Sequence, residues 1–229
     1  MQNTMPQSKH KTLLSWSSGK DSALSLCALK RHGGYEIEAL LTTIAENGGR
    51  IGAHGVRRVL LERQASSCGY PLEKVFLPED AANDQYEVAL EKVYERSRAE
   101  GVTSVVFGDI FLEDIRKYRE KHLEKAGMRA LFPLWNRDTF ELATEFIDLG
   151  FSAVITSVDT RILDKGMLGK PFDRTFLSEL PPGTDPCGEN GEFHTFVFDG
   201  PIFRESIRYT VGEIWPELNQ YWLCDLVPA

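Results

Sequence analysis

Residues 17–22 combine small, hydroxyl-bearing and charged side chains between an apolar run and a segment with helical periodicity. Small residues let backbone N–H groups approach an anion, and the start of the following helix adds partial positive charge. Lys20 supplies a full charge that can stabilise departing phosphate groups, and Asp21 can hold Mg²⁺ that bridges phosphate oxygens. We therefore expect a phosphate-binding turn. Its other members are Ser17, Ser18, Gly19 and Ser22.

Two well-known nucleotide-binding patterns are absent from this turn. The chain contains neither G-x-x-x-x-G-K-S/T nor G-x-G-x-x-G. Composition alone leaves an ordinary polar turn between a strand and a helix as the alternative.

Gly108 and Asp109 follow a second apolar run, residues 103–107. Ligands of open parallel sheets bind at the carboxyl ends of strands, near the point where the strand order reverses. We therefore expect Gly108 to line the nucleotide site. Asp109 is expected near Asp21, as a catalytic residue or a second Mg²⁺ ligand. A plain strand-ending turn is the alternative.

Residues 181–191 (PPGTDPCGENG) are dense in Pro, Gly, Asp and Asn, and long structured loops in compact domains are often functional. Glu192 and His194 follow this loop and can exchange protons, since an unperturbed histidine has a pKa of ~6.5. We expect both to be catalytic, and Glu189 and Asn190 to bind substrate. A histidine with a purely structural role is the alternative.

The apolar and helical segments alternate, which predicts an α/β fold with a doubly wound parallel sheet. Asp138 is expected to cap the last of these helices, with Glu141 three residues on. The pattern changes after residue 159, so we expect an ATP-binding domain over 1–158 and a small α+β substrate-binding region over 159–229. The expected parallel strands are 12–16, 36–45, 72–77, 103–107 and 151–158.

The string SSGKDS at 17–22 resembles the SGGKDS signature of the PP-loop ATP pyrophosphatases, which are adenine nucleotide α-hydrolase-like enzymes with a HUP, Rossmann-like fold. Ser18 stands where that signature has glycine, which is costly if the position needs a positive φ. Further strings are similar to the diphthine–ammonia ligase family, in particular its short single-subunit members, over about residues 12–200. They are HGVRR (54–58), GDIFLEDIRKYRE (108–120), FPLW (132–135) and DPCGENGEFHTFV (185–197).

This resemblance implies an ATP-dependent ligase that forms an amide. ATP converts a carboxylate into an acyl-adenylate with release of pyrophosphate, and ammonia then displaces AMP. The implied ligands are ATP, Mg²⁺, ammonia and a small-molecule or protein-borne carboxylate, so the acceptor stays open between diphthine and another acid. The resemblance also implies that Arg116 and Tyr118 face the acceptor, whereas a charge run alone favours a solvated helix face.

Composition narrows the alternatives. The 229 residues include 34 acidic and 26 basic ones, a net charge of −8, which argues against a nucleic-acid partner. The four cysteines form no C-x-x-C pair, and no apolar run is long enough for a membrane span. We expect a cytoplasmic protein, with homodimerisation left open. Two alternatives remain: ATP-dependent RNA base modification of the thiolation type, and an ATP-binding sensor without turnover.

Overall fold

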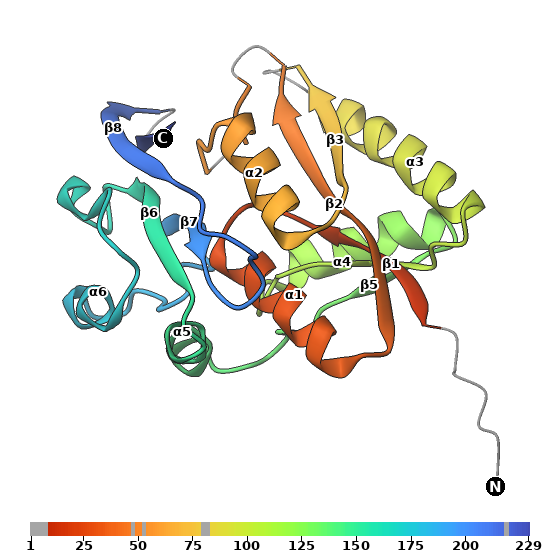
Figure 1. Ribbon diagram of the computed structural model, residues 1–229, viewed down its shortest axis with the longest axis horizontal. Helices are drawn as coiled ribbons and strands as arrows, with labels where there is room; N and C mark the ends of the chain where they lie inside the picture. The colour runs from red at the N-terminus through yellow and green to blue at the C-terminus, as the bar shows by residue number, and fades with distance from the viewer. Residues whose placement is uncertain (1–8, 47–48, 52–53, 79–82, 218–219) are drawn as a thin grey trace, which may run out of the picture.

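The described part of the chain forms two β-sheets and the helices that pack against them. The computed structural model describes residues 9–46, 49–51, 54–78, 83–217 and 220–229. Helix α1 (Lys20–His32) lies at the junction, because it packs against strands of the first sheet and also contacts the second (Figure 1).

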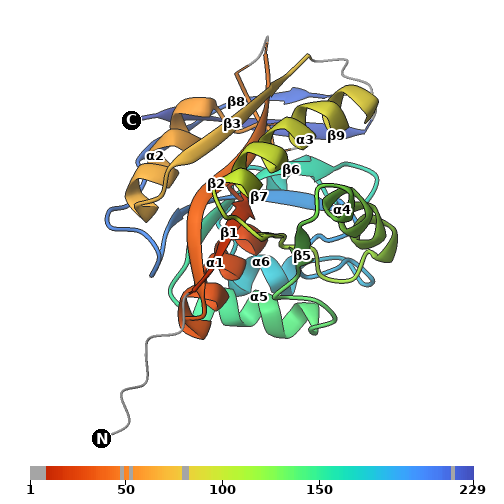
Figure 2. The ribbon, with the colours of Figure 1, turned by 90° about the vertical axis from the view of Figure 1, so that its right-hand side faces the viewer.

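The first sheet has five parallel strands in the order β3-β2-β1-β4-β5. Helices α1 and α2 pack on one face, and α3 and α4 pack on the other (Figures 1 and 2). The strands are β1 (His10–Ser15), β2 (Tyr35–Ala45), β3 (Leu72–Leu77), β4 (Ser104–Val106) and β5 (Arg129–Leu131), and the remaining helices are α2 (Arg58–Cys68), α3 (Asn83–Ala99) and α4 (Glu113–Lys125).

Alternate residues of each strand enter different cores. Leu14 and Leu40 pack with α1 and α2, whereas Leu13 and Leu41 pack with α3 and α4. Burial of both faces explains why the strands are nearly continuous apolar runs. The predicted doubly wound parallel sheet is confirmed.

The strand order reverses between β1 and β4, which are direct neighbours with Leu14 opposite Val106. Parallel strands end at the same edge, so the residues after Ser15 and those after Val106 emerge side by side. This is the position at which open α/β sheets bind ligands.

The second sheet is antiparallel, in the order β7-β6-β9-β8. Its strands are β6 (Ser152–Asp159), β7 (Phe193–Asp199), β8 (Tyr209–Pro216) and β9 (Tyr221–Pro228). Here the structure corrects an expectation, because the run at 151–158 is a strand of this sheet and not of the parallel one. The fifth parallel position belongs to β5. An apolar run fits the interior of either sheet equally well, so composition does not assign its partners. The expected boundary at 158 separates β6 from the strands it pairs with.

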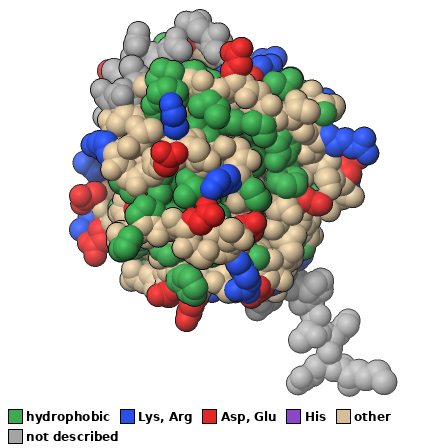
Figure 3. Space-filling view, turned by 90° about the vertical axis from the view of Figure 1, so that its left-hand side faces the viewer, with side chains coloured by type: hydrophobic (Ala, Val, Ile, Leu, Met, Phe, Trp, Pro, Cys, Tyr) green, Lys and Arg blue, Asp and Glu red, His purple; other side chains and the backbone are tan. Residues whose placement is uncertain are grey.

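The second sheet is covered by short helices and ends in an edge strand. Asp138 caps α5 (Thr139–Asp148) by accepting a hydrogen bond from the Glu141 N–H at 2.9 Å, as predicted. Two further helices, η1 (Lys165–Met167) and α6 (Arg174–Glu179), follow β6. Figure 3 views the side on which β8 and α6 lie, where apolar side chains gather; the exposed ones of β8 are Val211 and Ile214. Homodimerisation stays a prediction.

Within the described part of the chain, no helix combines the length and the apolar character needed to cross a membrane.

Candidate active site

A cavity of about 220 Å³ opens where the first sheet's switch point meets the second sheet. It brings together residues from the turn after β1, the turn after β4 and the segment before and within β7. The predicted site residues that line it are Ser17, Lys20, Asp21, Ser22, Gly108, Asp109, Glu189 and His194.

The turn after β1 has an unusual backbone at Ser18. Its φ is +72°, in the left-handed region that favours glycine, so the expected conformational cost of serine is present. The Ser18 carbonyl accepts hydrogen bonds from the Val197 N–H at 3.0 Å and from Gln64 Nε2 at 3.1 Å. The hydroxyl of Ser18 is buried and has no partner among the described residues. Strand β7 and helix α2 therefore hold this turn in place.

The start of α1 is also tied to the second sheet. Gly19 is its N-cap and makes no side-chain cap bond, and the Lys20 N–H donates to Thr195 Oγ1 at 3.1 Å. A Cβ on Gly19 would lie 2.9 Å from the His54 ring and 3.2 Å from the Thr195 carbonyl. Only glycine fits this close approach, which packs the two sheets together directly beneath the cavity.

Lys20 is buried yet remains charged. Its Nζ lies 2.9 Å from Asp21 Oδ2, donates to the Cys187 carbonyl and sits 5.4 Å from the centre of the Phe193 ring. Burial lowers the pKa of Lys20, but Asp21 and the other nearby acidic groups outweigh it, so the net pKa is raised. A cation is thus fixed at the N-terminus of α1, where an anion is favoured.

Asp21 is the carboxylate best placed for a divalent cation. Burial raises its pKa and Lys20 opposes that shift, with the net pKa above its ordinary value. Its Oδ1 is buried and has no hydrogen-bond partner among the described residues. An unpartnered carboxylate oxygen beside a phosphate-binding turn suits a hard cation such as Mg²⁺.

Asp109 lies near Asp21, as expected, because Gly108 brings the two segments together. A Cβ on Gly108 would lie 3.0 Å from the Asp21 backbone. However, Asp109 pairs with Arg119, with 2.8 Å between Arg119 Nε and Asp109 Oδ2 and 3.1 Å between Nη2 and Oδ1. This ion pair balances the charge of the carboxylate that was expected to hold Mg²⁺, while its buried Oδ2 accepts no hydrogen bond among the described residues, so the metal role of Asp109 stays a prediction.

Glu192 and Asn190 brace the loop and do not line the cavity. Glu192 is 3% exposed, and its Oε1 accepts from the Asp185 N–H at 3.2 Å and from Asn190 Nδ2 at 2.9 Å. Gly188 supplies the bend before it at a φ of +67°, where a Cβ would lie 2.7 Å from the Phe193 carbonyl. Oε1 of Glu192 thus supports the loop, Oε2 has no hydrogen-bond partner among the described residues, and the expected role in proton transfer stays a prediction.

Glu189 is the loop carboxylate that does face the cavity. Its Oε1 accepts from the Ile110 N–H at 2.7 Å. Burial, with smaller contributions from Asp21 and Asp109, raises the pKa of Glu189 to about 7. Near neutral pH this group can therefore both take up and release a proton.

His194 lies beside a second histidine, His54, with the ring centres 4.5 Å apart. Burial lowers the pKa of His54 to about 4 and holds that of His194 well below its ordinary value. His54 Nδ1 lies 3.2 Å from the Thr195 carbonyl, so this nitrogen carries the proton and donates. Both rings are neutral at pH 7, which suits hydrogen bonding and not storage of a proton.

Arg116 and Tyr118 do not line this cavity, and their expected contact with the acceptor stays a prediction. The Arg116 guanidinium stacks on Trp135 at 4.6 Å, and Tyr118 is 39% exposed with its ring 4.4 Å from His122. The phase of α4 turns Arg119 inward instead. The charge run does not single out Arg119, because any of its cations could face inward until the helix is packed.

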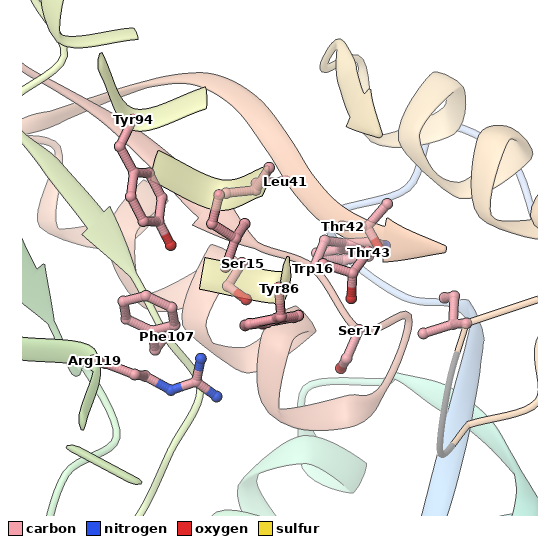
Figure 4. Close-up of a pocket in the computed structure, with 12 residues that line it drawn as sticks. Ser15, Trp16, Ser17, Leu41, Thr42, Thr43, Tyr86, Tyr94, Phe107 and Arg119 are labelled. Atoms are coloured by element: carbon pink, nitrogen blue, oxygen red, sulfur yellow. The ribbon is translucent and has the colours of Figure 1, made fainter. Parts of the chain in front are cut away.

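A second pocket of about 100 Å³ adjoins the first at the ends of β1 and β2 (Figure 4). The two share Ser15, Ser17, Phe107 and Arg119. Leu41, Thr43, Tyr86 and Tyr94 also line the second pocket. The second pocket thus places apolar and aromatic walls beside the turn 17–22.

The parallel sheet, its switch point and the turn 17–22 define an α/β protein of the PP-loop ATP pyrophosphatase class. The family model described as "Diphthamide synthase N-terminal domain" matches residues 10–130, and "Diphthamide synthase C-terminal domain" matches residues 138–226. The chain belongs to the diphthamide synthase family. The two matched segments correspond to the two sheets.

Curated relatives agree with this family. The diphthine–ammonia ligases of Bos taurus and Homo sapiens are each 33% identical over 141 residues, which cover 59% of this chain and 51% of theirs. That of Danio rerio is 31% identical over 157 residues, 65% of this chain and 59% of its own. The chain thus spans about half the length of the first relatives it matches. A solved U34-tRNA thiolase from Methanococcus maripaludis is 17% identical with a TM-score of 0.37, covering 65% of this chain and 61% of its own.

Proposed function

We propose that this protein is an ATP-dependent ligase that adenylates a carboxylate, releasing pyrophosphate, and passes the acyl group to ammonia. One observation carries the proposal. A single cavity is lined both by the phosphate-binding turn, through Lys20 and Asp21, and by the C-terminal segment, through Glu189 and His194. A two-step ligase needs this arrangement, because the activated acyl group must meet its second partner without leaving the site.

ATP would span the two adjoining cavities. Its phosphates would lie against the start of α1, where Gly19 leaves the helix without a side-chain cap. Backbone N–H groups and the helix dipole favour phosphate there. The adenosine would occupy the pocket between Leu41, Tyr86 and Tyr94, whose walls suit a flat aromatic base.

In the first step a carboxylate oxygen of the acceptor attacks the α-phosphorus, and the bond to the β-phosphate oxygen breaks. Negative charge builds up on the departing pyrophosphate. Lys20 is held at this position as a cation by Asp21 and the Cys187 carbonyl. A fixed positive charge in a partly dehydrated site stabilises such a transition state without reorganisation.

In the second step ammonia attacks the acyl carbon, AMP leaves, and the new amide nitrogen gives up a proton. Glu189 is the lining carboxylate suited to receive it, because its pKa is about 7. The neutral His194 would orient the acceptor by hydrogen bonding. The loop and β7 wall off this side of the cavity, which limits hydrolysis of the adenylate by water.

The residues present fit one divalent cation ligand. Asp21 would hold Mg²⁺ through its unpartnered Oδ1, and the cation would neutralise charge on the phosphate oxygens. Asp109 fits this task less well, since Arg119 already pairs with it.

The thiolation alternative needs a reactive sulfur or a metal cluster. All four cysteines are buried and free, and burial raises the pKa of Cys68 to about 12 and of Cys224 to about 11. Protonated thiols are poor nucleophiles. Among the described residues no group of three or more His, Cys, Asp or Glu side chains could hold a metal. These features favour the ligase over the thiolase.

The test is a product analysis. The protein would be incubated with ATP labelled at the α-phosphate, Mg²⁺, ammonium and elongation factor 2 carrying diphthine, with a panel of small carboxylic acids as alternative acceptors. We expect AMP and pyrophosphate in equal amounts, and only when an acceptor is present.

Lys20→Ala serves as the control for contaminating activity. Formation of ADP and orthophosphate would refute the adenylation chemistry. Tight ATP binding with no AMP under any acceptor would favour the sensor.

A further inference from the structure

Arg119 occupies the point at which the two cavities meet. It lines the pocket proposed for adenosine and the cavity that holds Lys20. In Figure 4 its guanidinium lies beside Phe107 and points toward the space between Tyr86 and Ser17. A nucleotide that spans both cavities must pass this group.

The guanidinium is clamped on two sides. Nη2 donates to Asp109 Oδ1 at 3.1 Å, Nε lies 2.8 Å from Asp109 Oδ2 as an ion-pair contact without hydrogen-bond geometry, and the Phe107 ring centre lies 4.3 Å from Cζ. Within the described part of the chain, Nη1 makes no hydrogen bond. The contacts with Asp109 and Phe107 therefore fix the plane of the guanidinium, and its Nη1 stays free to donate hydrogen bonds.

Lys20, the other cation of the site, is differently placed. Its side chain is 4% exposed, and its ammonium already engages Asp21 and the Cys187 carbonyl. The Arg119 side chain is 27% exposed. Arg119 is therefore the cation whose free donors face an incoming anion, and a planar fork of N–H groups matches phosphate oxygens.

We propose that Arg119 binds the phosphate chain of the nucleotide where the two cavities join, and that Asp109 is its positioning residue and not a metal ligand. This inference rests on the proposed function, because it takes the ligand to be ATP. It assigns the phosphate contact to Arg119 and the orientation of the Arg119 guanidinium to Asp109.

The experiment compares ATP and adenosine binding by calorimetry in the presence of Mg²⁺, which needs no acceptor. Arg119→Gln should weaken ATP binding about 10- to 100-fold, the worth of a hydrogen bond to a charged group, and should leave adenosine affinity within about threefold. Arg116→Gln is the matched control. It removes the same charge from the same helix outside both cavities and should change neither affinity.

Asp109 is tested by non-additivity. Asp109→Asn should weaken ATP binding less than Arg119→Gln, and the double variant should bind ATP no worse than Arg119→Gln alone. Thermal unfolding of each variant shows whether it is folded. If Arg119→Gln does not fold, Arg119→Lys replaces it, because lysine keeps the charge but lacks the planar guanidinium. The ATP affinity of Arg119→Lys should lie between that of the parent and that of the double variant Asp109→Asn/Arg119→Gln.

The possible failures are distinguishable. A parent that binds no ATP overturns the proposed function and this inference with it. A parent that binds ATP, with Arg119→Gln or Arg119→Lys binding equally well, overturns the inference alone. Additive losses in the double variant would show that Asp109 acts independently of Arg119 and would overturn its positioning role.

Discussion

Replacing Ser18 by glycine should make the protein more stable. Ser18 has a φ of +72° and a buried hydroxyl without a partner among the described residues. Its carbonyl is fixed by the Val197 N–H and by Gln64 Nε2, so the turn cannot relax to a negative φ without breaking both bonds. The side chain is therefore held in a costly conformation and in a costly environment.

The magnitude follows from three contributions. A residue with a Cβ pays about 1–2 kcal/mol in the left-handed region, and an unsatisfied buried hydroxyl costs about 1–3 kcal/mol. Glycine removes both, but its greater freedom in the unfolded chain offsets about 0.5–1 kcal/mol. Ser18→Gly should thus raise the free energy of unfolding by about 1–4 kcal/mol.

Ser18→Ala separates the two causes, because alanine removes the hydroxyl and keeps the positive φ. Urea unfolding followed by circular dichroism gives both values if the denaturant slope is unchanged. We expect Ser18→Gly to be more stable than Ser18→Ala by about 1 kcal/mol, the difference between the relieved conformation and the added chain entropy. A Ser18→Gly protein less stable than the parent would refute the reasoning.

Three further predictions follow from the site. Lys20→Ala should slow acceptor-dependent AMP formation about 10²-fold, since it removes one stabiliser of the departing charge; an unchanged rate in a labelled-ATP assay would move the phosphate site elsewhere. The pKa of Glu189 is about 7 in the folded protein against an ordinary value of 4.5, so between these pH values the folded state binds a proton that the unfolded state has lost. The free energy of unfolding should therefore fall as the pH rises from 4.5 to 7. Glu189→Gln should flatten that slope in urea titrations at pH 5 and pH 8, and a slope like the parent's would contradict the assigned environment. Glu192→Ala leaves the buried Asp185 N–H unpaired and should lower the free energy of unfolding by about 1–3 kcal/mol, whereas a loss of turnover at unchanged stability would restore a catalytic role.

The parallel sheet could be predicted because its central strands β1 and β4 are buried on both faces. Leu13 and Leu14 enter different cores, so the run around them has no polar side and is typical of a central parallel strand. The same property led to the wrong prediction that β6 belongs to the parallel sheet. It is also buried throughout, but its partners β7 and β9 come later in the chain, and pairing at that separation leaves no trace in local composition.

The candidate site was predictable where a local pattern carries the chemistry. The turn 17–22 does so, because small residues, a cation and a helix start are adjacent in sequence. Arg119 and His54 could not be singled out, since their positions at the cavity depend on helix phase and on a contact with β7. Glu192 shows the converse: it belongs to a promising motif, yet it does not line the cavity and its Oε1 holds the loop.

The transfer of labelled oxygen from the acceptor to AMP is a direct test of carboxylate adenylation. An acceptor whose carboxylate carries ¹⁸O would be incubated with the protein, ATP, Mg²⁺ and ammonium, and the nucleotide product would be analysed by mass spectrometry. Attack of the carboxylate on the α-phosphorus, followed by cleavage of the acyl–oxygen bond by ammonia, leaves one ¹⁸O atom in each AMP. Carboxylate adenylation predicts this singly labelled AMP together with unlabelled pyrophosphate. Unlabelled AMP, or label in orthophosphate beside ADP, would contradict it.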